Sequence, residues 1–121
     1  MGKFIVKPTN TGIKFDLLGA DDAVLATSEV YSSVSACLNG VQSVKKSCVG
    51  GVEDQTVEGF ESRNHPKFEI FCDKGGKFRF HLKAVNGQIV AISKAFVDKA
   101  ECAACIDAVK AAAPEAPIEK A

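Results

Sequence analysis

The strongest constraint on the fold is an internal repeat. Residues 2–48 align with residues 67–113, with a single one-residue gap in the first turn. The matched pairs include Lys3 with Lys67, Phe4 with Phe68, Phe15 with Phe80, Leu17 with Leu82, Cys37 with Cys102 and Val44 with Val109. Two copies of one sequence pattern predict two copies of one structural unit. We therefore expect two similar units, joined by a linker at residues 49–66.

Each unit has the pattern of three strands followed by a helix. In the second unit, Phe68–Phe71 is a short β-rich run, and residues 77–83 alternate between apolar and polar, as a half-buried strand does. Asn86-Gly87 is typical of a two-residue hairpin, because both positions tolerate positive φ. The third strand is expected over residues 88–93.

A helix is predicted at the end of each unit. Asp98, followed three residues later by Glu101, has the form of a capping box, and Ser33 occupies the aligned cap position in the first unit. Apolar residues then recur at helical spacing, at Cys37, Val41, Val44 and Cys48 and at Cys102, Ile106, Val109 and Ala113. Pro114 is expected to end the second helix. Gly40, inside the first helix, predicts a close approach of a neighbouring element.

The fold class predicted from this pattern is α+β. A lone unit of three strands and one helix is marginally stable, so the two units are expected to merge. Their edge strands would pair into one antiparallel six-stranded sheet, with both helices on one face. Residues 1–113 would then form a single domain, and the Ala/Pro/Glu-rich tail at 114–121 is predicted to be disordered.

The sequence resembles the YegP-like family of small bacterial domains of unknown function, often found as tandem repeats. The resemblance rests on three segments, Lys67–Phe71, Gly76–Gly87 and Asn39–Lys46. It implies that two β3-α units share one sheet and exchange their C-terminal helices, and it supplies no catalytic residues. The sequence departs from the family pattern at Asp21-Asp22, in the first hairpin, and at Ala104-Cys105, in the second helix.

Composition narrows the classes of function. The formal net charge is zero, which does not favour nucleic-acid binding by the whole surface. Five cysteines, an odd number, indicate free thiols in a reducing compartment, so a cytoplasmic location is expected. No apolar run reaches the length of a membrane span. We expect a monomer or a weak homodimer, with no cofactor.

Cys102 and Cys105 form a CxxC pair, which suggests a thiol or metal function. However, Asp98 is the predicted cap, so Cys102 lies a full turn inside the helix and not at its N-terminus, where a reactive thiol is favoured. No second pair of ligands with zinc spacing accompanies it. The alternative is that both residues are small buried hydrophobes.

A row of basic residues is the second candidate site. Lys77, Arg79, His81 and Lys83 alternate with apolar residues and should project from the face opposite the core. They could bind an anion or a nucleic acid, although no aromatic platform beyond Phe71 accompanies them. The alternative is an ordinary solvated strand face.

No catalytic constellation is evident, so the sequence favours a non-enzymatic binding or interaction module, with a protein or an anionic ligand as its partner. A small enzyme with its site between the two units is a further hypothesis, because pockets favour such interfaces.

Overall fold

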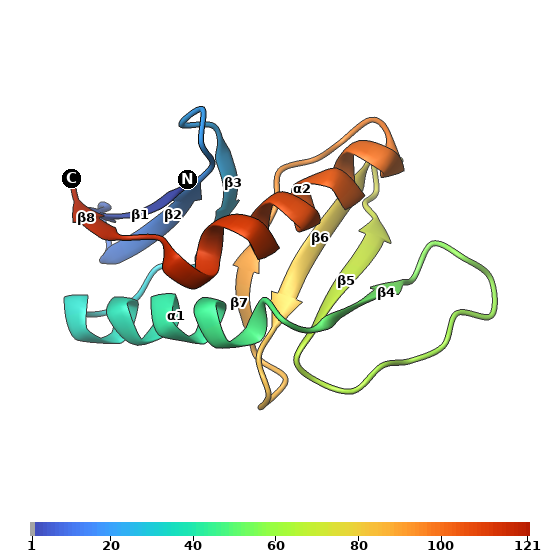
Figure 1. Cartoon of the computed structure of the whole chain (residues 1–121), viewed down its shortest axis with the longest axis horizontal. Coiled ribbons are helices and arrows are strands. Elements are labelled where there is room, and N and C mark those ends of the chain that lie inside the picture. Colours follow the sequence, from blue (N-terminus) through green and yellow to red (C-terminus); the bar gives the residue numbers. More distant parts are fainter. Residues whose placement is uncertain (1) are drawn as a thin grey trace.

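The computed structural model describes residues 2–121, which form a mixed sheet and two long helices (Figure 1). The strands are β1 (Lys3–Pro8), β2 (Ile13–Leu18), β3 (Val24–Thr27), β4 (Gly51–Asp54), β5 (Lys67–Cys72), β6 (Phe78–Lys83), β7 (Ile89–Ile92) and β8 (Ile118–Lys120). The helices are α1 (Val34–Ser47) and α2 (Lys99–Ala112), followed by a short 3-10 turn, η1 (Ala113–Glu115). The fold is α+β, as the sequence predicts.

The sheet has eight strands in the order β4-β5-β6-β7-β3-β2-β1-β8. The prediction of six antiparallel strands is wrong in number and in type, because β4 pairs parallel with β5 and β8 pairs parallel with β1. The six expected strands form the antiparallel centre. There β3 and β7 join the two units through Thr27 and Ile92, which occupy aligned positions.

The two additional strands lie in segments where no strand was predicted. β4 belongs to the linker, and β8 belongs to the tail predicted to be disordered. The tail is held by burial of Ala116, by a hydrogen bond from Lys45 Nζ to the Ala116 carbonyl (2.9 Å) and by pairing of Ile118 with Phe4. The strand after each helix therefore completes the edge of the other unit.

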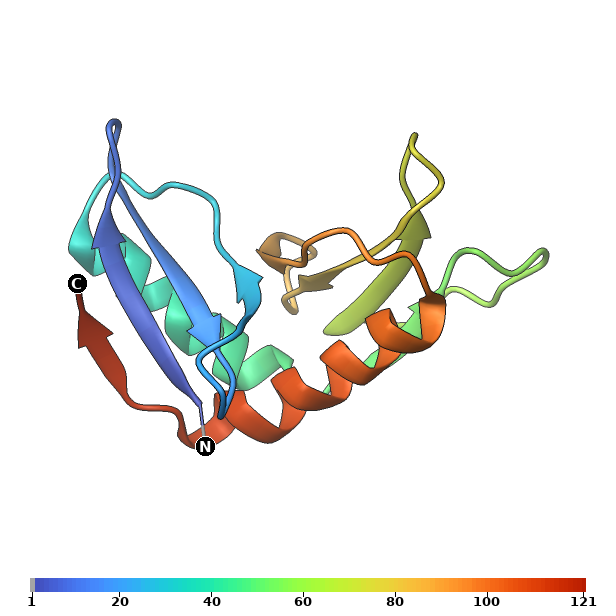
Figure 2. The same cartoon turned by 90° about the horizontal axis from the view of Figure 1, so that it is seen from above.

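Both helices lie on one face of the sheet, as predicted (Figure 2). α1 contacts strands of both units, namely β1, β2, β6 and β7, and α2 contacts β3 and β6. The predicted caps are present: the Ser33 side chain accepts from the Ala36 N–H, and the Asp98 side chain accepts from the Ala100 N–H. The predicted apolar stripes are buried between the helices and the sheet.

A close approach at Gly40 explains one difference between the units. A Cβ at this position would collide with the hydroxyl of Tyr31. The aligned residues in the second unit are Cys105 and Phe96, and a phenylalanine lacks that hydroxyl. Gly40 therefore accommodates Tyr31, and Cys105 is permitted where Phe96 replaces the tyrosine.

Candidate functional site

The sheet face opposite the helices, called here the outer face, carries the predicted basic row. Arg79, His81 and Lys83 project from β6 on this face, because Phe78, Phe80 and Leu82 point into the core. Lys77 is exposed and lies just before β6. Three of the four residues therefore project from one strand, as the alternating pattern predicts, and Lys77 directly precedes it.

Acidic side chains pair with three of the four basic residues. Arg79 Nε donates to Asp73 Oδ2 at 2.8 Å. His81 Nε2 contacts Glu69 Oε1, and Lys83 Nζ lies 3.3 Å from the same oxygen. Because three of these four side chains already have a carboxylate partner within the chain, the row supports an internally neutralised network better than a free cationic surface.

The centre of this network is a buried cluster on β4 and β5, which we call the closed cluster: Glu53, Lys67 and Glu69. Lys67 Nζ lies 2.8 Å from Glu53 Oε1 and 3.1 Å from Glu69 Oε2, so one ammonium bridges two carboxylates. The side chain of Lys67 is 7 % exposed and that of Glu53 is 2 % exposed. A buried ion pair of this kind requires complete hydrogen bonding to be tolerated.

The linker supplies the remaining hydrogen bonds. The backbone N–H of Arg63 donates to Glu53 Oε1 at 2.7 Å, and Gln55 Nε2 donates to Glu53 Oε2 at 2.6 Å. The Arg63 side chain lies over Gly51, where a Cβ would be 3.1 Å from Nη1. The returning part of the linker therefore closes the outer face beside β4.

These contacts shift the pKa values of the cluster. Burial alone would raise the pKa of Glu53, but the donors on Lys67, Gln55 and Arg63 outweigh it and hold this pKa at about 2. The hydrogen bond to Glu53 raises the pKa of Lys67. Burial would raise the pKa of Glu69, but its contacts with His81, Lys67 and Lys83 outweigh burial and lower this pKa. The cluster is therefore ionised and satisfied at neutral pH.

The aligned positions of the first unit form an open counterpart, which we call the open pair: Lys3 and Glu119. Lys3 aligns with Lys67, and Glu119 lies opposite Ile5 on β1 just as Glu53 lies opposite Glu69 on β5. Here Lys3 Nζ is 3.6 Å from Glu119 Oε1, and the two side chains are 32 % and 54 % exposed. No hydrogen bond from another segment reaches Glu119 among the described residues.

The neighbouring charges of the first unit converge on Asp16. Lys7 Nζ is 2.6 Å and Lys14 Nζ is 3.6 Å from its carboxylate oxygens, and Thr27 Oγ1 donates to Oδ1 at 2.6 Å. Burial opposes the lowering of the Asp16 pKa, but these partners prevail. Lys7 and Lys14 thus share one carboxylate on the outer face.

Apolar side chains occupy the outer face where the units meet. Val24, Ile89 and Ile92 are each more than 40 % exposed, and they come from the adjacent strands β3 and β7. Val24 and Ile89 occupy aligned positions on either side of the Thr27–Ile92 bridge. The first unit and this junction together present an uncovered surface of apolar and mixed charged residues.

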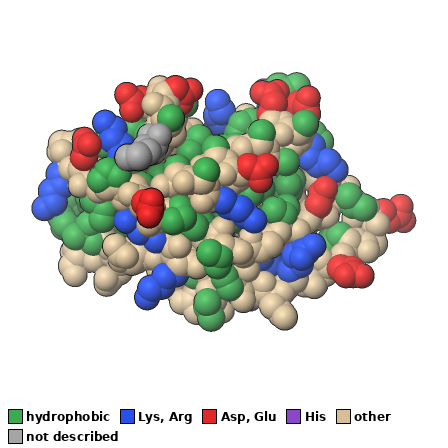
Figure 3. Space-filling view, viewed as in Figure 1, with side chains coloured by type: hydrophobic (Ala, Val, Ile, Leu, Met, Phe, Trp, Pro, Cys, Tyr) green, Lys and Arg blue, Asp and Glu red, His purple; other side chains and the backbone are tan. Residues whose placement is uncertain are grey.

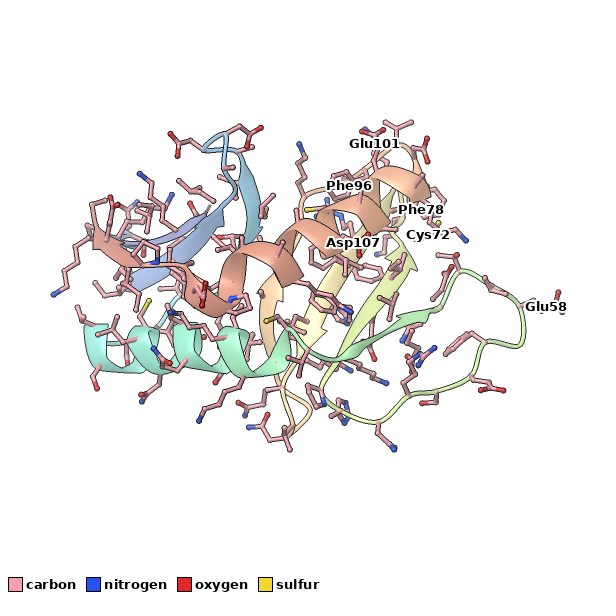
Figure 4. All side chains as sticks on the ribbon, in the orientation of Figure 1. Glu58, Cys72, Phe78, Phe96, Glu101 and Asp107 are labelled. Atoms are coloured by element: carbon pink, nitrogen blue, oxygen red, sulfur yellow. The ribbon has the colours of Figure 1, made fainter. Side chains whose placement is uncertain are left out.

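The predicted thiol site lies on the other side of the sheet. Cys102 is fully buried, Cys105 is half-buried with Sγ 3.3 Å from the Leu25 carbonyl, and burial raises the pKa of each to about 11. Such thiols are almost entirely protonated at neutral pH, which favours the interpretation as buried hydrophobes. Cys72 is the exposed thiol among the described residues, and it lies opposite Phe78 where β5 pairs with β6 (Figure 4).

Other kinds of site find little support within residues 2–121. No cluster of three or more His, Cys, Asp or Glu side chains could hold a metal ion there, and no described helix is long and apolar enough to cross a bilayer. Two shallow grooves of about 300 Å³ lie at aligned places, each between the last turns of one helix and the β-hairpin of the other unit. On the helix side, basic and acidic side chains are interspersed (Figure 3).

Sequence reasoning missed Glu53, Lys67 and Glu69. The alternation along β5 places Lys67 and Glu69 on the outer face, and the register of β5 with β6 places Glu69 opposite His81, so these two could have been found. Glu53 carried no such signal, because β4 lies within a segment without an alternating pattern.

Comparison with known proteins adds a family to this geometry. A family model described as "Domain of unknown function (DUF1508)" matches residues 9–52 and 73–119. The chain belongs to the DUF1508 family. The two matched segments are compatible with the repeat seen in the sequence, and the predicted resemblance to the YegP-like family is confirmed.

Relatives of this DUF1508 chain occur at two lengths. A UPF0339 protein of Pseudomonas aeruginosa is 34 % identical over 115 residues, which cover 94 % of this chain and 92 % of the relative. A UPF0339 protein of Treponema denticola is 48 % identical over 52 residues, which cover 43 % of this chain but 90 % of that relative. The second relative is therefore matched over about one unit.

A solved structure shares the fold. The solution NMR structure of the protein of unknown function yegP from E. coli has a TM-score of 0.80 and 23 % identity to this DUF1508 chain, covering 98 % of this chain and 91 % of that one. This likeness shows the fold alone.

Proposed function

We propose that the chain is a cytoplasmic, non-enzymatic interaction module built from a duplicated β3-α unit, and that it binds a polypeptide partner through its uncovered outer face. The observation that carries this proposal is the exposure of three apolar side chains along β3 and β7, Val24, Ile89 and Ile92, on a face that the helices leave free. Exposed apolar side chains surrounded by charges of both signs are typical of protein–protein interfaces.

The charge balance favours a polypeptide over a nucleic acid. Binding to phosphates requires free Lys and Arg side chains that release counterions. Arg79, Lys83 and Lys7 instead have carboxylate partners within the chain. The nucleic-acid alternative would predict salt-dependent binding that is lost in the double variant Arg79→Ala, Lys83→Ala, and we expect no such binding at low salt.

Site-specific photo-crosslinking tests the proposed function. A photoreactive amino acid in place of Ile92 should give discrete polypeptide adducts in cells that carry the chain. The same group in place of Val49, an exposed valine between α1 and the edge strand β4 and away from the junction, should not. The adduct at position 92 should also disappear when Val24→Asp is present in the same chain. With Val24 intact, the adduct should form again from the purified chain and its purified partner. Equal adducts at both positions, or none at position 92, would contradict the proposal.

Thiol titration tests the alternative centred on Cys102 and Cys105. Because burial raises both pKa values to about 11, we expect an aromatic disulfide reagent to modify Cys72 rapidly in the native chain and the other four thiols on the timescale of unfolding. A Cys72→Ser variant provides the control, since it should leave little fast reaction. Rapid modification of Cys102 or Cys105 in that variant would support a thiol function instead.

A further inference from the structure

The two aligned lysine–glutamate pairs differ in what completes them. Glu53 receives a backbone N–H from Arg63, an amide from Gln55 and the ammonium of Lys67. Among residues 2–121, the Glu119 carboxylate is paired only with Lys3, at 3.6 Å, and both side chains are partly exposed. The closed cluster thus shows how a pair of parallel edge strands in this sheet accepts an extended segment of polypeptide on its outer face.

We propose that the open pair, Lys3 with Glu119, is a docking site for an extended segment of the partner polypeptide, which lies beside β8 and β1 as the Arg63 segment lies beside β4 and β5. This inference rests on the proposed function and names the chemistry of its partner. A backbone N–H of that segment donates to Glu119, and a basic side chain complements the carboxylate.

The residues that differ between the units set the preference of the site. Glu69 of the closed cluster is replaced by Ile5 in the first unit, so the residue opposite Glu119 on β1 is apolar and not acidic. Phe71 is replaced by Lys7, whose ammonium is held by Asp16. The segment therefore carries an arginine or lysine next to an apolar residue, which packs on Ile5.

A peptide selection tests this inference on the full chain. Peptides selected from a random library against the immobilised protein should be enriched in a basic residue beside an apolar one. Their addition to the isotope-labelled chain should shift amide resonances of β1 and β8. Glu119→Lys should weaken their binding about tenfold or more, because it reverses the charge that the peptide meets. Glu58→Lys, at the tip of the linker away from the sheet (Figure 4), makes the same charge change and should leave binding unchanged.

A second variant guards against loss of β8. Ile5→Lys changes the apolar contact while every residue of β8 is kept, and it should reduce affinity while the far-ultraviolet spectrum is retained. Peptides that shift only the resonances around Val24 and Ile92 would overturn this inference but leave the proposed function intact. Failure to select any peptide, together with no crosslink at position 92, would overturn both. Concentration-dependent shifts of β1 and β8 without peptide would show a second copy as the occupant and would also overturn it.

Discussion

The two halves of the sheet have the same ion pair but not the same surroundings. In the second unit, Lys67 and Glu53 are 2.8 Å apart and buried, whereas in the first unit Lys3 and Glu119 are 3.6 Å apart and in solvent. The backbone that carries them is the same: a parallel edge strand beside the first strand of a unit. The difference lies in residues 55–66, which return over β4 and supply hydrogen-bond donors to Glu53. The repeat therefore gives both halves the same backbone scaffold, and the linker covers the ion pair in only one of them.

The largest loss of stability should come from removing Lys67, and removal of the aligned Lys3 provides the comparison. Lys67→Met leaves two buried carboxylates without their shared ammonium, and we expect a loss of about 3–5 kcal/mol in the free energy of unfolding. Lys3→Met breaks an exposed pair and should cost less than about 1 kcal/mol. Urea denaturation of both variants at neutral pH measures the two losses. Similar losses would mean that the two pairs do not differ in burial.

A smaller effect, of about 1–3 kcal/mol at neutral pH, is expected from Glu53→Gln, because a buried carboxylate with three donors is replaced by an amide. The pKa of Glu53 is about 2 in the folded chain and 4.5 ordinarily, so its contribution to stability is complete above about pH 4.5 and is lost as the pH falls toward 2. The gap between the wild type and Glu53→Gln should therefore close over this range.

The aligned control for this titration is Glu119→Gln. Its unfolding free energy at neutral pH should lie within about 1 kcal/mol of that of the wild type, because the Glu119 side chain is exposed. Urea midpoints recorded from neutral pH down to pH 2 provide the comparison. A gap for Glu53→Gln that stayed constant with pH would show that the carboxylate is not held in its charged form.

A loss of about 1 kcal/mol, smaller than the losses expected for Lys67→Met and Glu53→Gln, is expected from Gly40→Ala. The new Cβ would meet the Tyr31 hydroxyl, and the gain in helix propensity offsets part of the overpacking. Adding Tyr31→Phe should recover part of the loss, because it reproduces the combination of Cys105 with Phe96 in the second unit. Thermal unfolding of the single and double variants gives the coupling, and simple additivity would be the contrary result.

The sequence predicted what depends on local pattern. The hairpins, the caps at Ser33 and Asp98, the buried stripes and the placement of both helices on one face followed from alternation, turn residues and helical spacing. A repeat also gives each such pattern twice. Gly40 was correctly predicted to mark close packing, although its partner Tyr31 could not be named from the sequence.

The sequence did not predict what depends on pairing between distant segments. β4 and β8 are short edge strands, and they form because parallel partners are already in place on β5 and β1. The composition of residues 114–121 resembles that of a disordered tail, and burial of Ala116 against the core outweighs it. Because β4 was not predicted, Glu53 was not predicted either, and the neutralisation of the basic row by Glu69 was overlooked.

Carboxyl labelling of the intact chain tests most directly whether one half is closed and the other open. A water-soluble carbodiimide with an amine nucleophile, followed by mass spectrometry, reports the reactivity of each glutamate. Glu119 should be modified rapidly in the native chain, and Glu53 should stay protected until the chain unfolds, because Arg63, Gln55 and Lys67 occupy its oxygens. Equal rates for Glu53 and Glu119 would contradict the account.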